Sequence, residues 1–246
     1  MKRALYMVLI VIVCITGFFV GKKVYTMENP VIDNSEEISE EGTSIGTFFS
    51  DALSSLQAAK KEDLKAKYEQ ARAVSNETKG WIWIENTRID YPIMLGQNNY
   101  YLNRSYDGKS SSSGSIFLDE AQPGFGNVNV IHGHNMLNGK MFTDLHKFYR
   151  AETKDQMKYV YIYDGESDIE RKFEVFSVMR VSASYSLKMN IGNLADTKVY
   201  AQELKNQSAY KYNFTLEEKP ILILNTCFSD GTNDHLIVAL QEIENN

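Results

Sequence analysis

Eight short runs of β-prone residues between positions 81 and 243 place the strongest constraint on the fold of this chain. Each run is rich in aliphatic or aromatic residues, and turn signals such as Pro123-Gly124 and Asp164-Gly165 separate most of them. The runs are 81–84, 89–95, 115–118, 127–132, 158–163, 172–181, 221–226 and 236–243. Helical interruptions are expected at 140–150 and 195–207. Many short strands with few helices predict an antiparallel or mixed β-barrel.

A helical segment is predicted ahead of the strands, over about 48–74. Its apolar residues fall at helical steps, so they form one stripe: Phe49, Leu53, Leu56, Leu64, Tyr68 and Ala71. The charges at 60–63 are read as the solvated face of this helix, and Gly80 ends the helical region.

The N-terminus predicts a membrane anchor. Lys2 and Arg3 precede an uncharged apolar run over 4–20, which as a helix would be about 26 Å long, close to the ~30 Å hydrocarbon core of a bilayer. The run continues into lysines without the small residues of a cleavage site, which favours an uncleaved anchor over a cleaved signal. The predicted organisation is a cytoplasmic stub and transmembrane anchor at 1–26, an acidic linker at 27–46 and a globular domain at 47–246, exported to the extracellular side.

The charge balance argues against a nucleic-acid partner. The formal net charge is −6, whereas nucleic-acid binders usually carry a basic face. The excess acid lies in the linker, because residues 28–41 hold six carboxylates and no Lys or Arg. The composition, with 43% hydrophobic residues, is that of a globular protein.

The two cysteines, Cys14 and Cys227, are not expected to form a disulfide, since Cys14 lies inside the apolar run. Cys227 ends the predicted strand at 221–226, where a thiol can face a cleft as a nucleophile. An inert buried thiol is the alternative. A polar loop leads from Cys227 to His235 at the start of the last strand, so pairing of the two strands would bring His235 near the thiol. His132 and His134 end another strand, and a metal site built on them is a less favoured alternative because no third ligand is evident.

These residues resemble the class B sortases, cysteine transpeptidases of Gram-positive bacteria. The run Leu224-Asn-Thr-Cys227 is similar to the sortase T-L-x-T-C signature, and Gly133-His134-Asn135-Met136 is similar to the segment that holds the family's catalytic histidine. Residues 89–120, with Ile89-Asp-Tyr-Pro-Ile, Gly96-Gln-Asn-Asn-Tyr-Tyr-Leu102 and Gly114-Ser-Ile-Phe-Leu-Asp119, are similar to class B in particular. The resemblance covers about 48–246.

The resemblance implies a mainly β fold with some α, a closed sortase-type barrel with an N-terminal helical extension after the single transmembrane helix. It implies Cys227 as nucleophile and His134 as general acid and base. The family's third catalytic residue is an arginine at the start of the last strand that hydrogen-bonds the substrate carbonyl and oxyanion. Here His235 stands at that place, so His235 would substitute for it, or an arginine from elsewhere, such as Arg104 or Arg180, would reach in.

The implied reaction needs no cofactor or metal. Cys227 would cleave the C-terminal sorting signal of a surface protein through a thioester, and an amine of a cell-wall peptidoglycan precursor or a pilin would resolve it. By the class B resemblance Asn98 and Leu102 would line the substrate groove, and Asn225 and Thr226 would flank the nucleophile; a purely structural role is the alternative for Asn98 and Leu102. A degenerate, non-catalytic binding module, or another exported cysteine peptidase, remains open as an alternative function.

Overall fold

The computed structural model describes residues 64–244, all of which belong to one structural unit. The predicted anchor at 1–26 and linker at 27–46 lie outside the described residues, as does most of the predicted helix at 48–74; its described part, 64–74, is helical. Over the described range, no helix combines the length and the apolar character needed to cross a bilayer.

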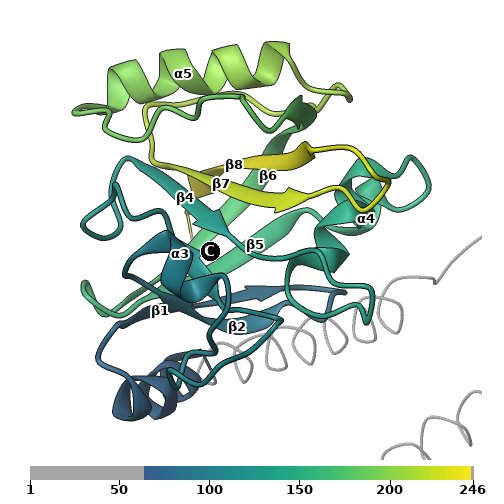
Figure 1. Cartoon of the computed structure of the whole chain (residues 1–246). Coiled ribbons are helices and arrows are strands. Elements are labelled where there is room, and N and C mark those ends of the chain that lie inside the picture. The colour runs from purple at the N-terminus through teal and green to yellow at the C-terminus, as the bar shows by residue number, and fades with distance from the viewer. Residues whose placement is uncertain (1–63, 245–246) are drawn as a thin grey trace, which may run out of the picture. The chain divides into compact units, whose positions relative to one another are not determined.

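Eight strands close into a barrel (Figure 1). They are β1 (Thr78–Ile84), β2 (Asp90–Met94), β3 (Ile116–Leu118), β4 (Val128–His132), β5 (Tyr159–Asp164), β6 (Ile169–Ser182), β7 (Ile221–Cys227) and β8 (Asp234–Ile243). Their order around the wall is β1-β2-β3-β4-β7-β8-β6-β5, and β5 pairs back onto β1. The β2–β3 and β4–β7 pairs are parallel and the others antiparallel. The predicted mixed barrel is confirmed, and each of the eight predicted runs coincides with a strand.

The helices lie in the connections. Besides the helical residues 64–74 ahead of β1, they are α3 (Asn98–Tyr101), η1 (Phe142–Leu145), α4 (His146–Tyr149), η2 (Lys154–Gln156) and α5 (Leu194–Asn206). The predicted interruption at 140–150 corresponds to η1 and α4, and the one at 195–207 to α5. Helix α5 begins after Asn193, whose side chain accepts a hydrogen bond from the backbone N–H of Asp196 at 2.8 Å, a standard N-cap.

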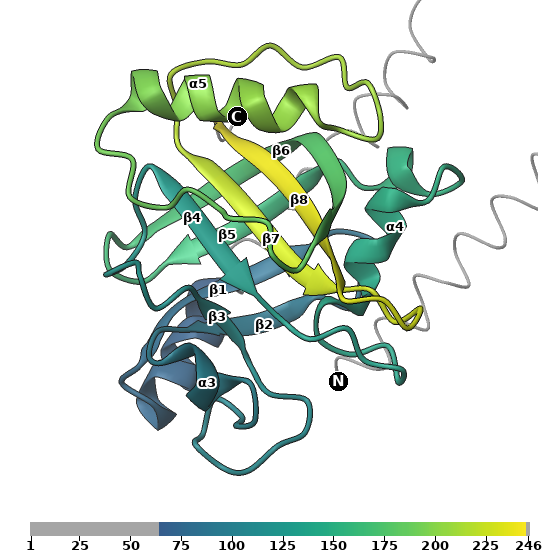
Figure 2. The same cartoon turned by 45° about the horizontal axis from the view of Figure 1, so that its top comes forward.

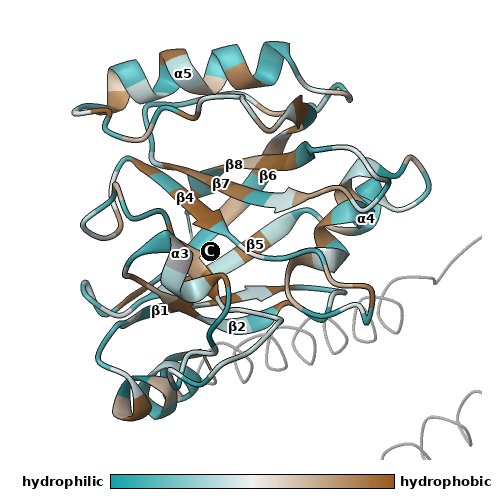
Figure 3. Ribbon diagram, in the orientation of Figure 1, coloured by the Kyte–Doolittle hydropathy of each residue, from teal (hydrophilic) through white to brown (hydrophobic). Residues whose placement is uncertain are grey.

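Strands β7 and β8 are buried on both faces. Residues such as Leu224 and Val238 point into the barrel, whereas Ile223 and Ile237 point outward and pack against α5. This alternation follows from the two-residue period of a strand. Figures 1 and 2 show α5 beside these strands, and Figure 3 shows hydrophobic residues concentrated in the strands. The cover supplied by α5 explains why the sequence of β7 is apolar at successive positions.

Candidate active site

The outward face of the wall becomes polar where β7 ends. Asn225 and Cys227 continue the outward set that begins with Ile221 and Ile223, while Thr226 falls in the inward set and is 2% exposed. The Thr226 hydroxyl has no hydrogen-bond partner in the described part of the chain. The nucleophile candidate therefore stands on the outer surface of the barrel, one step beyond an inward threonine.

Cys227 is exposed and forms no disulfide. It pairs with His235 across β7 and β8, and its Sγ lies 3.9 Å from Nε2 of His235. The expected proximity of thiol and imidazole is confirmed. Partial burial raises the pKa of the Cys227 thiol, because burial disfavours the charged thiolate. A proton acceptor beside Sγ would therefore assist nucleophilic attack.

The segment after β4 runs alongside the end of β7. His132 pairs with Asn225 in the parallel β4–β7 ladder, and the backbone N–H of Gly133 then donates to the carbonyl of Asn225 at 3.2 Å. Asn135 Nδ2 lies 3.0 Å from the carbonyl oxygen of Cys227. His134 lies in the chain between Gly133, which contacts Asn225, and Asn135, which contacts Cys227, so its backbone lies beside the end of β7.

The side chain of His134 is held by a backbone group. Its Nε2 lies 2.8 Å from the carbonyl oxygen of Leu102, so Nε2 carries a proton and donates. Leu102 itself packs against Met94, Tyr101 and Phe117. His134, predicted as the general acid and base, and Leu102, predicted to line the substrate groove, are thus in direct contact.

Gly133 is required by packing. A Cβ at this position would come within 3 Å of the side chains of Ile116 and Phe142, so any larger residue would force one of these two side chains to move. The glycine of the Gly-His pair thereby fixes where His134 lies.

Four polar side chains extend the site from His235 toward β3. Nδ1 of His235 lies 3.0 Å from Oδ1 of Asn225, and Nδ2 of Asn225 lies 3.0 Å from Nδ1 of His132. Nε2 of His132 is 2.8 Å from Oδ2 of Asp119. Asn98, predicted as a substrate contact, donates to the same carboxylate at 3.3 Å. Asn225 and Asn98 thus belong to the hydrogen-bonded network behind the nucleophile, and their contact with a substrate stays a prediction.

The side chains of His132 and His134 contact different groups and do not converge on one point. His132 engages Asp119 and Asn225, while His134 engages a carbonyl. Within residues 64–244, no cluster of three or more His, Cys, Asp or Glu side chains is arranged to hold a metal ion.

His146 is a residue of the site that the sequence does not reveal. The run Leu145-His146-Lys147-Phe148 predicts an ordinary helical surface residue. His146 does begin the helix α4, but its Nε2 lies 3.1 Å from the carbonyl oxygen of Cys227 and 2.9 Å from Asn135 Nδ2. Its ring meets Phe228 edge to face at 4.8 Å. The surface interpretation was wrong because α4 is a single turn whose first residue faces the β7–β8 loop.

The two candidate arginines are both engaged elsewhere. Arg104 donates to the carbonyl of Gly108 and stacks on Tyr100. Arg180, on β6, forms ion pairs with Asp230 at 2.8 Å and Asp234 at 2.7 Å. Arg180 therefore binds the loop that joins Cys227 to His235, rather than Cys227 or His235 itself.

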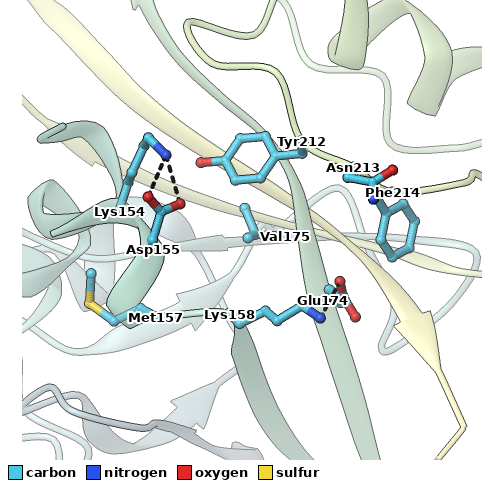
Figure 4. Close-up of a pocket in the computed structure, with 9 residues that line it drawn as sticks. All are labelled: Lys154, Asp155, Met157, Lys158, Glu174, Val175, Tyr212, Asn213 and Phe214. Carbon is cyan, nitrogen blue, oxygen red and sulfur yellow. Dashed lines mark hydrogen bonds and ion pairs between the residues drawn. The ribbon is translucent and has the colours of Figure 1, made fainter. Parts of the chain in front are cut away.

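A separate pocket of about 310 Å³ lies beside β5 and β6 (Figure 4). It is lined by nine residues: Lys154, Asp155, Met157, Lys158, Glu174, Val175, Tyr212, Asn213 and Phe214. Its lysines form ion pairs with Asp155 and Glu174. The pocket shares no residue with the site around Cys227.

Comparisons with known proteins agree with this geometry. The chain matches the Sortase domain family over residues 82–242. It is 28% identical to sortase B of Listeria monocytogenes, over 92% of this chain and 89% of that protein, and 24% identical to sortase B of Staphylococcus aureus, over 97% of each.

Solved structures show the same barrel. The X-ray structure of Clostridium perfringens sortase B has 30% sequence identity and a TM-score of 0.66, covering 72% of this chain and 99% of that one. The crystal structure of a Bacillus anthracis protein described as similar to sortase B has 26% identity and a TM-score of 0.66, covering 73% of this chain and 83% of that one. With a family match over most of its length and an exposed cysteine beside two histidines, this chain belongs to the sortase family and is a class B cysteine transpeptidase.

Proposed function

We propose that this protein is a membrane-anchored sortase that cleaves the C-terminal sorting signal of surface proteins through a thioester on Cys227. The observation that carries the proposal is the position of Cys227, which ends β7 with β8 and His235 on one side and the segment holding His134 on the other. Sγ attacks the scissile carbonyl, and His134 protonates the leaving amine.

An amine then resolves the thioester and receives the surface protein. The acceptor is an amine of a cell-wall peptide or of a pilin. Relatives support a substrate and a glycine-peptide amine as the two partners, because solved structures include a Staphylococcus aureus sortase B–substrate complex and a sortase B complexed with triglycine. Those chains are 19% and 18% identical to this one and share its fold.

The catalytic domain is proposed to lie on the extracellular side of the cell membrane. The support is the sequence alone: basic residues flank both ends of the uncharged run over 4–20, a short stub precedes the run, and the acidic linker and the whole domain follow it. Export of the C-terminal domain is the simpler arrangement of these parts. This arrangement would hold the barrel near newly exported substrates and wall precursors.

The test uses the full chain in detergent micelles with a panel of quenched sorting-signal peptides, with and without triglycine. We expect peptide cleavage, a ligated product when triglycine is present, and a thioester on Cys227 detectable by mass spectrometry. Cys227→Ala should abolish all three. Cys14→Ala, which removes the other thiol, is the matched control and should leave them unchanged. A reaction that persists in Cys227→Ala would refute the proposal. Absence of cleavage by the parent chain across the panel would favour the binding-module alternative.

A further inference from the structure

We propose that His235 takes the proton from the Cys227 thiol, and that Asn225, His132 and Asp119 hold its imidazole in the tautomer that this transfer requires. The inference rests on the proposed function and deepens it. It assigns His235 the work of a base, which differs from the arginine-like donor that its position in the sequence implies.

The donors and acceptors of the network can be assigned from Asp119, which can only accept hydrogen bonds. The hydrogen bond from His132 outweighs partial burial and lowers the pKa of Asp119, so the carboxylate is ionised and can only accept. Nε2 of His132, 2.8 Å away, must therefore carry the proton. The other nitrogen, Nδ1, faces the Nδ2 amide group of Asn225 at 3.0 Å. An amide N–H can only donate, so Nδ1 of His132 accepts.

The side chain of Asn225 links His132 to His235 and donates to the first while accepting from the second. Since Asn225 turns its Nδ2 amide group toward His132, its amide oxygen lies on the other side of the same planar group. The amide oxygen then faces His235, and it lies 3.0 Å from Nδ1. An amide oxygen can only accept, so Nδ1 of His235 carries a proton.

The tautomer of His235 decides which group it presents to the Cys227 thiol. A neutral His235 with its proton on Nδ1 has a lone pair on Nε2, and Nε2 is the atom that lies 3.9 Å from Sγ of Cys227. The histidine thus offers an acceptor to the S–H group. Cysteine, histidine and asparagine are arranged as a nucleophile, a base and a group that orients the base.

The surroundings of His235 keep the imidazole neutral. Partial burial is the largest cause that lowers the pKa of His235, a positive charge on His132 of β4 would lower it further, and Asp234 on its own strand opposes both. Arg180, which reaches in from β6, is paired with Asp234. The remaining titratable neighbour is Cys227 itself, on β7. The pair therefore rests as thiol and neutral imidazole.

The protons balance over the reaction. As Sγ bonds to the carbonyl carbon, its proton moves to Nε2 of His235, giving an imidazolium whose Nδ1–H still donates to Asn225. The tetrahedral intermediate collapses, and protonated His134 gives its proton to the leaving amine. When the acceptor amine attacks the thioester, His134 takes the amine's proton, and His235 returns its own to the departing thiolate.

The first test reads the tautomer directly, without any substrate. The full chain, labelled with ¹⁵N in histidine and held in detergent micelles, contains four histidines, which single His→Gln variants assign. At about pH 8, where ordinary histidine is neutral, we expect a protonated Nδ1 and an unprotonated Nε2 for His235. His132 should show the opposite pattern. A protonated Nε2 in His235 would overturn the proposal.

Substitutions at Asn225 test the orienting role. Asn225→Ala removes the acceptor, so His235 should shift toward the Nε2–H tautomer, which imidazole prefers in water, and kcat/KM should fall about tenfold for one lost orienting hydrogen bond. Asn225→Asp keeps an oxygen facing Nδ1 and should retain the Nδ1–H tautomer. An unchanged His235 spectrum in Asn225→Ala would show that Asn225 does not set the tautomer.

The pH dependence of peptide cleavage distinguishes two roles of His235, a neutral base and a cation that replaces an arginine. If His235 is the base, kcat/KM rises with pH through the pKa of His235, which lies below the ordinary 6.5. His235→Gln and His235→Arg should each then lower kcat/KM by about a hundredfold or more. If His235 instead replaces an arginine as a cation, activity falls through the same range and His235→Arg keeps it. Loss of all cleavage with the tautomers intact would count against the proposed function alone.

Discussion

At the scale of single residues, burial lowers the pKa of two histidines beside Cys227, His146 and His235. Burial is the largest cause that lowers the pKa of His146, although its hydrogen bond to the Cys227 carbonyl opposes the shift. Burial likewise lowers the pKa of His235. Both rings are therefore neutral near pH 7, and each can offer one donor and one acceptor in a fixed arrangement.

This burial predicts that the protein loses stability in mild acid. Below pH 6.5 the unfolded chain binds protons at these histidines that the folded chain does not, so the free energy of unfolding falls as the pH drops from 6.5 toward the lower folded pKa. Thermal unfolding of the full chain, followed between about pH 7.5 and 5, measures the slope. His146→Gln should reduce that slope, whereas Lys147→Gln, a change at the neighbouring position, should not. An identical slope in His146→Gln would contradict the prediction.

At the scale of elements, one cation organises the loop between β7 and β8. Arg180 forms ion pairs with Asp230 and Asp234, donates to Thr232 Oγ1 at 3.0 Å and lies 4.2 Å from the Phe228 ring centroid. The loop turns at Gly231, whose φ of 84° is in the region that glycine adopts without strain. Because the loop joins Cys227 to His235, Arg180 positions the two reacting side chains through it.

Removal of this cation should open the loop. We expect Arg180→Ala to speed chymotrypsin cleavage at Phe228 by roughly fivefold, since local opening exposes the bond, and mass spectrometry of the fragments measures it. Arg104→Ala removes another arginine that stacks on an aromatic ring, in a different loop, and should leave cleavage at Phe228 unchanged. Equal protection of Phe228 in Arg180→Ala and the parent would show that the loop holds its shape without the cation.

The sequence predicts the elements better than it predicts their contacts. All eight strands follow from β-prone runs and turn signals, and the nearness of Cys227 and His235 follows because a short loop joins adjacent strands. Helices α3 and η2 are single turns, too short to show a helical period. The Asn225–His132 contact joins residues far apart in the chain across a parallel pair, and no local pattern gives that register.

At the scale of the whole molecule, two hydrophobic clusters share the same strands. Leu224 belongs to the cluster inside the barrel and Leu204 to the cluster under α5, and both are fully buried. Strands β7 and β8 contribute side chains to both clusters. Loss of one cluster would therefore expose one face of the strands that carry Cys227 and His235.

This sharing predicts that barrel and α5 unfold together. Leu224→Ala and Leu204→Ala remove the same atoms from the two clusters, and each should lower the free energy of unfolding by about 2–5 kcal/mol. In urea, the fluorescence of Trp81 and Trp83 reports on β1, opposite β7 in the barrel order, while circular dichroism reports on helix. The two signals should share one midpoint in the parent and in both variants. A helix signal lost before the fluorescence changes in Leu204→Ala would show instead that α5 is a separate unit, and that the outer face of β7 keeps its structure without it.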